Sequence, residues 1–86
     1  MYNRKGIEDN RRMLVRSNEE CFLGLSNGNE DEKRIAEERL KTNFLLTSYV
    51  LDILKEMMQD EYLNEVIAEG EKYRQRWKDY YKKSSL

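Results

Sequence analysis

The sequence predicts an all-α protein, a small bundle of three helices. Its 86 residues contain no proline and four glycines, so few positions force a helix to break. Charged residues make up 38% of the chain, and apolar residues recur between them at intervals of three and four, which is the period of an amphipathic helix. A chain this short has room for one domain, so we expect a single helical domain over residues 1–86.

The first helix is predicted over about residues 5–24, where apolar side chains repeat at spacings of seven and four. These apolar residues are Ile7, Leu14, Cys21 and Leu25. Three polar residues interrupt the stripe, and we expect them at its solvated edge, because polar side chains are seldom fully buried. They are Arg11, Ser17 and Asn18.

The first helix should stop at Ser26-Asn27-Gly28-Asn29, four turn-forming residues in succession. Asn29 is then the expected N-cap of the second helix, because Glu32 follows at the spacing of a capping box. A connection this short places consecutive helices side by side and antiparallel. The sequence therefore predicts an antiparallel hairpin of the first two helices.

The second helix, predicted over residues 29–58, is apolar on two faces instead of one. The first stripe consists of Ala36, Leu40, Phe44, Thr47, Leu51, Leu54 and Met58. The second stripe consists of Ile35, Leu46, Val50, Ile53 and Met57. Because two stripes need two covering surfaces, we expect one to be covered by the first helix and the other by the third helix or by another chain.

Residues 59–61 decide between two arrangements of the chain. If the chain turns there, with Asp60 as a new N-cap, the third helix can cover the second stripe. If the helix runs straight on, the second stripe becomes an interface in a coiled-coil assembly. The sequence does not choose between them, and it predicts a bundle that is completed by forming an oligomer or by joining a larger complex.

The third helix is predicted over residues 61–82, with 84–86 as a frayed tail. Its apolar stripe consists of Tyr62, Val66, Gly70, Tyr73, Trp77 and Tyr80. A glycine inside a helix costs about 1 kcal/mol relative to alanine. Gly70 therefore marks either the close approach of a neighbouring helix or a tolerated substitution, and the sequence favours neither.

The composition argues against catalysis. The chain has no histidine, which removes the usual general base near neutral pH and the commonest metal ligand. One cysteine without histidine leaves no zinc site, and Cys21 lies on an apolar stripe where a buried thiol is expected. We therefore expect no enzyme, no catalytic residues, no metal and no cofactor.

The C-terminal segment is the best candidate for a binding site because it alternates cations with aromatic rings. The predicted partner-binding residues are Lys72, Tyr73, Arg76, Trp77, Tyr80, Tyr81 and Lys83. The rings either pack against the other helices or dock a protein, since Tyr, Trp and Arg dominate interface hot spots. Binding of nucleic acid or of an anionic ligand is the alternative, which the net charge of −6 over residues 29–69 disfavours.

These observations together predict a non-catalytic helical module for protein interaction: an adaptor, an inhibitor, a regulator or a subunit of a larger complex. Its partner would be another protein, a second copy of the chain, or both. The first residues are charged, the most apolar window spans 11 residues from Phe44 to Leu54, and a membrane span needs about 20. With a single cysteine as well, we expect no signal peptide, no membrane contact and a cytoplasmic location.

Overall fold

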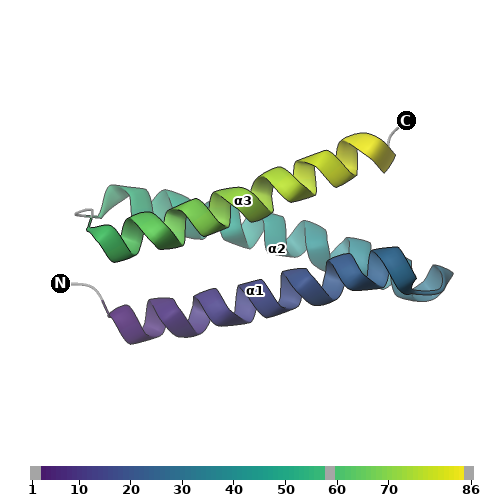
Figure 1. Ribbon diagram of the computed structural model, residues 1–86, viewed down its shortest axis with the longest axis horizontal. Coiled ribbons are helices and arrows are strands. Elements are labelled where there is room, and N and C mark those ends of the chain that lie inside the picture. Colours follow the sequence, from purple (N-terminus) through teal and green to yellow (C-terminus); the bar gives the residue numbers. More distant parts are fainter. Residues whose placement is uncertain (1–2, 58–59, 85–86) are drawn as a thin grey trace. The chain divides into compact units, whose positions relative to one another are not determined.

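Three α-helices make up the fold, as the sequence predicts (Figure 1). The structure, a computed structural model, describes residues 3–57 and 60–84. The helices are α1 (Arg4–Asn27), α2 (Glu30–Glu56) and α3 (Glu61–Ser84), and the described residues contain no strand. Contacts group the chain into two compact units, Met1–Asn43 and Phe44–Leu86. Because the division falls within α2, each unit is a helical hairpin.

Local capping explains where each helix begins. The Asn3 side chain accepts a hydrogen bond from the Gly6 amide at the start of α1. At the start of α2, the Glu32 amide donates to Asn29 Oδ1 at 2.9 Å, and the Asn29 amide donates to Glu32 Oε1 at 3.4 Å. This reciprocal pair is a capping box, which confirms the predicted start of the second helix.

The first helix extends three residues beyond its predicted end. Ser26 and Asn27 remain helical, and the helix ends at Gly28. The backbone is extended at Gly28 (φ −78°, ψ 163°), and its amide donates to the carbonyl oxygen of Gly24 at 2.8 Å. A Cβ at position 28 would lie 2.5 Å from that oxygen and 2.8 Å from Glu32 Cβ. A side chain has no room there, so the glycine permits the close turn into α2.

The first unit is the predicted antiparallel hairpin. Near the turn, a Cβ added at Gly24 would lie 3.3 Å from Ala36 Cβ. Further from the turn, Asn43 Nδ2 donates to Ser17 Oγ at 2.9 Å. Earlier residues of α1 therefore pair with later residues of α2, which confirms the antiparallel arrangement.

Asn18 contradicts the prediction for the polar residues of the first helix. Its side chain is 4% exposed and therefore buried, although we expected it at the solvated edge. Asn18 lies one turn after Leu14 and one turn before Cys21, so helix geometry places it on the same core-facing side. Arg11 and Ser17 are half-buried.

The second unit is also an antiparallel hairpin, so the chain turns between α2 and α3. Asp60 caps α3, since its carboxylate accepts a hydrogen bond from the Leu63 amide at 2.8 Å. The hairpin closes through Leu51, which lies against Gly70. Helix α2 ends at Glu56, two residues before its predicted end; Met58 and Gln59 lie outside the described residues.

The third helix runs to Ser84, two residues beyond its predicted end. The predicted frayed tail begins at that residue, and its remaining two positions lie outside the described residues. The close contact of Gly70 with Leu51 supports the close-approach interpretation of this glycine.

Each of the two units buries short and medium apolar side chains of its own. The buried apolar residues are Cys21, Ala36, Leu40, Leu51, Leu54, Leu63 and Val66. Every buried α2 residue of this set belongs to the first predicted stripe. Three residues of the second stripe, Ile35, Leu46 and Ile53, are exposed instead. Cover of these three residues by the third helix, one of the two alternatives, is therefore wrong, because α3 contacts first-stripe residues. Cover by another chain, the other alternative, stays a prediction.

Candidate functional site

The predicted partner-binding residues lie along the C-terminal half of α3, with different degrees of exposure. Tyr73, Trp77 and Tyr80 are half-buried. The remaining four residues are exposed: Lys72, Arg76, Tyr81 and Lys83. The three predicted cations and Tyr81 are therefore exposed to solvent, whereas the other three rings are partly covered.

Trp77 is the centre of a stack of three rings. Its centroid lies 4.2 Å from that of Phe44 on α2, with an interplanar angle of 24°. On the next turn of α3, Tyr81 lies 5.1 Å from Trp77 at an angle of 7°. The guanidinium of Arg74 lies 5.7 Å from the Phe44 centroid, within the range of a cation–π contact.

This stack connects the two helices of the second unit. Aromatic pairs of this geometry contribute about 0.5–1.5 kcal/mol beyond the area they bury. Trp77 therefore helps to hold α3 against α2, and its indole already stacks on two protein rings. A base or a partner side chain would have to displace one of those rings to stack on it.

A second surface lies on α2, and none of its residues is among the predicted partner-binding residues. Four large apolar side chains on two successive turns of α2 are 45–68% exposed. They are Leu45, Leu46, Tyr49 and Ile53, which we call the α2 apolar face. Leu45, Tyr49 and Ile53 form one row at four-residue spacing, and Leu46 lies three residues before Tyr49.

The sequence does contain a signal for this surface, namely the second apolar stripe. Leu46 and Ile53 belong to that stripe, whereas Leu45 and Tyr49 extend it on one side. The stripe predicts a surface that needs cover, and the structure leaves it exposed. The sequence does not indicate which of the two stripes α3 contacts.

Carboxylates border the α2 apolar face. Asp52 and Glu56 are exposed, and neither makes an ion pair with any residue that the structure describes. Lys55 lies beside them, but its Nζ contacts Glu71 Oε1 at 2.6 Å across the hairpin. The hydrogen bond from Lys55 lowers the pKa of Glu71, which favours the charged carboxylate.

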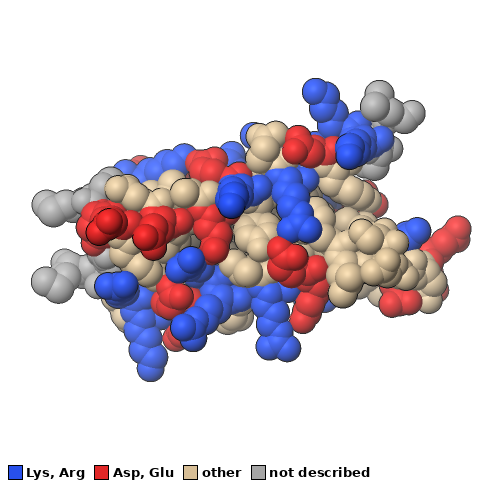
Figure 2. Space-filling view, in the orientation of Figure 1, with Lys and Arg blue, Asp and Glu red and all other residues tan. Residues whose placement is uncertain are grey.

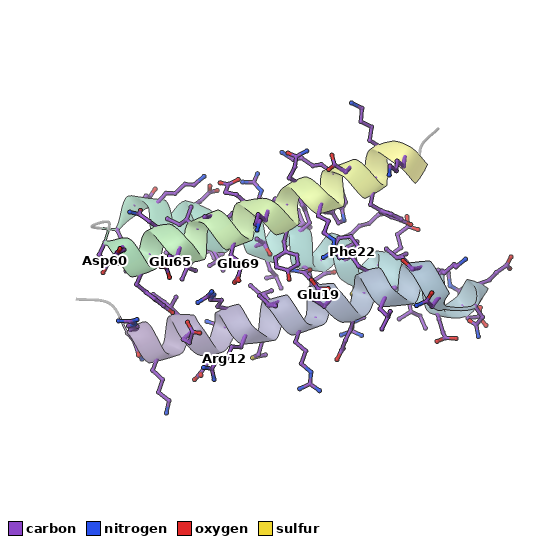
Figure 3. All side chains as sticks on the ribbon, in the orientation of Figure 1. Arg12, Glu19, Phe22, Asp60, Glu65 and Glu69 are labelled. Carbon is purple, nitrogen blue, oxygen red and sulfur yellow. The ribbon has the colours of Figure 1, made fainter. Side chains whose placement is uncertain are left out.

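Charge is separated along α3. Residues 61–71 carry four acidic and no basic side chains, whereas residues 72–84 carry six basic and one acidic. Figure 2 shows acidic side chains over the start of α3 and basic ones over its end. Glu65 and Glu69 are labelled on the acidic half in Figure 3, next to the capping Asp60. The first half of α3 is therefore negatively charged and the second half positively charged.

Cys21 has the surroundings of a buried structural thiol. Its side chain is 2% exposed, and burial raises its pKa, with Arg39 and Ser17 acting in the opposite direction. A neutral thiol is a poor nucleophile and a poor metal ligand. Among residues 3–57 and 60–84, no three Asp, Glu or Cys side chains gather as they would to hold a metal ion.

None of the helices, over their described residues, combines the length and the apolar character that crossing a membrane requires. Comparison with models of known protein families, with curated proteins and with solved structures gave no match. The two candidate surfaces, the C-terminal half of α3 and the α2 apolar face, both lie in the second unit.

Proposed function

We propose that this chain is a non-catalytic protein-interaction module that presents the α2 apolar face to a helical partner. It would act as an adaptor, an inhibitor, a regulator or a subunit of a larger complex. The observation that carries the proposal is the exposure of Leu45, Leu46, Tyr49 and Ile53 on one side of a single helix. Contiguous exposed apolar patches mark interaction sites on soluble domains.

The exposed rows suit a helix as the partner. Side chains spaced at three and four residues form ridges that fit the grooves of a second helix. Fully burying one Leu, Ile or Tyr side chain contributes about 1.5–3 kcal/mol, and about half of each is still exposed here. Covering all four would therefore contribute on the order of 4 kcal/mol, comparable to the net stability of a core this small.

The α2 apolar face supports this proposal better than the C-terminal half of α3 does. The aromatic residues of α3 that sequence patterns single out include Trp77, which already stacks on Phe44 and Tyr81. Nucleic-acid binding by that segment needs aromatic faces available to bases. Its exposed cations, Lys72 and Lys83 among them, supply an accessory charged surface in the proposal.

A reducing, cytoplasmic setting is part of the proposal. It is supported by the single cysteine, which is buried and has a raised pKa. A single thiol forms no disulfide within the chain, so the fold does not depend on an oxidising compartment.

Site-specific photocrosslinking tests the proposed surface. Tyr49 is replaced by a photoreactive phenylalanine analogue in the cells that produce the protein, and adducts are identified by mass spectrometry. The same analogue at Ala68, an exposed position on α3, is the matched control. We expect a discrete protein adduct from position 49 and none from position 68. No adduct from position 49, or the same adducts from both positions, would contradict the proposal.

A further inference from the structure

We propose that the α2 apolar face binds a cationic amphipathic helix, one whose apolar stripe is flanked by lysine or arginine. This inference rests on the proposed function and adds to it the chemistry of the partner. It follows from the charges that border the face and from which of them are already engaged.

The solvent-facing side of α2 within the second unit has a simple composition. Its exposed residues are Leu45, Leu46, Tyr49, Asp52, Ile53, Lys55 and Glu56. Four are apolar and three are charged. The single cation among them, Lys55, is held by Glu71 at 2.6 Å, so its charge is compensated within the hairpin.

The two carboxylates are not compensated in this way. Asp52 and Glu56 have no ion pair with a described residue, and they lie on either side of Ile53 in the sequence, at the end of the apolar row. A helix packed along Leu45, Tyr49 and Ile53 would bring its flanking side chains within reach of both carboxylates. Cations there would gain attraction, whereas carboxylates there would be repelled, because opposite potentials across an interface favour binding.

Repulsion also disfavours a parallel dimer through two identical α2 faces, because Asp52 and Glu56 of one copy would lie near the same carboxylates of the other. It also disfavours an acidic helix. An antiparallel second copy remains a distinct occupant that the test must separate from the cationic helix.

Two synthetic helical peptides with one common apolar stripe provide the test. One peptide carries lysine and the other glutamate at the flanking positions, and each is titrated into the full-length protein at about 20 mM salt. Binding is followed by amide chemical shifts, which locate the site on α2. We expect the lysine peptide to bind about ten-fold more tightly, with shifts centred on residues 45–56. The advantage should shrink at about 0.5 M salt, where the Debye length is only a few ångström.

Charge reversal on the protein makes the test specific. The double variant D52K/E56K should prefer the glutamate peptide, whereas D9K/E65K should keep the wild-type preference. Asp9 and Glu65 are also exposed carboxylates, so the control variant changes the net charge by the same amount away from the face. Leu46→Lys should weaken both peptides about ten-fold, and circular dichroism would verify that each variant stays helical.

Three results would overturn the inference. The first is equal affinity for the two peptides, and the second is a preference that D52K/E56K leaves unchanged. The third is a dimer of the unliganded chain in sedimentation velocity that Leu46→Lys dissolves, which would assign the face to a second copy. The first two results leave the photocrosslinking at position 49 unaffected, so failure of the charge argument is distinguishable from failure of the proposed function.

Discussion

Substituting Gly70 by alanine should lower the stability of the fold when residue 51 is leucine and raise it when residue 51 is alanine. In the wild-type chain, a Cβ at position 70 would lie 2.9 Å from Leu51 Cδ2 and 3.3 Å from its Cγ. Leu51 is almost fully buried, so its side chain has little room to move away. Forcing an extra methyl group into a packed core costs about 1–3 kcal/mol. Alanine regains about 1 kcal/mol of helix propensity, so Gly70→Ala should destabilise the fold by about 0–2 kcal/mol.

Leu51→Ala removes the atoms that meet the new methyl group. That substitution alone should cost about 2–5 kcal/mol, because it leaves a cavity in the core. In its background, Gly70→Ala has no steric cost left and should stabilise the fold by about 1 kcal/mol. The two substitutions should therefore be coupled by about 1–3 kcal/mol.

Urea unfolding of the four proteins, followed by circular dichroism at 222 nm, measures this coupling. If Leu51→Ala leaves too little folded protein, Leu51→Val supplies the same cycle at lower cost. Gly6→Ala is a control for propensity, because a Cβ there would meet only the Asn3 side chain, at 3.4 Å. The reasoning is refuted if Gly70→Ala has the same effect in both backgrounds within about 0.5 kcal/mol.

Three further predictions concern the cap, the thiol and the ion pair. Asp60→Ala should lower the free energy of unfolding by about 1 kcal/mol, because the Leu63 amide loses its partner, and Asp60→Asn should restore most of it in urea titrations. Cys21 should react with iodoacetamide at pH 8 far more slowly in the native protein than in urea, since burial raises its pKa; equal rates by mass spectrometry would contradict this. Lys55 lowers the pKa of Glu71 in the folded state, so the pair stabilises the fold above the unfolded pKa of about 4.3 and loses that effect as the pH falls through the folded value. Glu71→Gln should therefore cost up to about 0.5 kcal/mol at pH 7, a small effect because both side chains are about half exposed, and the cost should shrink as the pH falls through the folded pKa.

Sequence reasoning succeeded where the signal is local. The capping box of Asn29 and Glu32 depends on two residues three positions apart, and it placed the start of α2 correctly. The same local chemistry identifies Asp60 as a possible cap. The turn near Gly28 was expected in the right place, although α1 continues closer to it, because the steric need for a glycine depends on atoms from both helices.

The choice of packing partners could not be read in the same way. Helix α2 has two apolar stripes of similar strength, and periodicity gives no rank between them. Leu51 meets Gly70 because a position without a side chain lets α3 approach the first stripe closely. This contact leaves Leu46 and Ile53 exposed, and so determines where the candidate site lies.

The same limit applies to the rings of α3, whose role in binding a partner stays a prediction. A row of rings on one side of a helix is equally suited to a hairpin interior and to an external partner. Trp77 packs on Phe44, a residue 33 positions earlier in the chain, and a pairing over that distance leaves no mark in the local pattern.

The ring stack also determines what optical spectroscopy can see in this protein. Trp77 is the single tryptophan of the chain, and its indole lies against Phe44 within the second unit. Its emission therefore reports whether the hairpin of α2 and α3 is closed. It is not a direct probe of the contacts between α1 and α2. Tryptophan emission therefore follows the hairpin of α2 and α3, and a second chromophore on α1 would be needed to follow the hairpin of α1 and α2 directly.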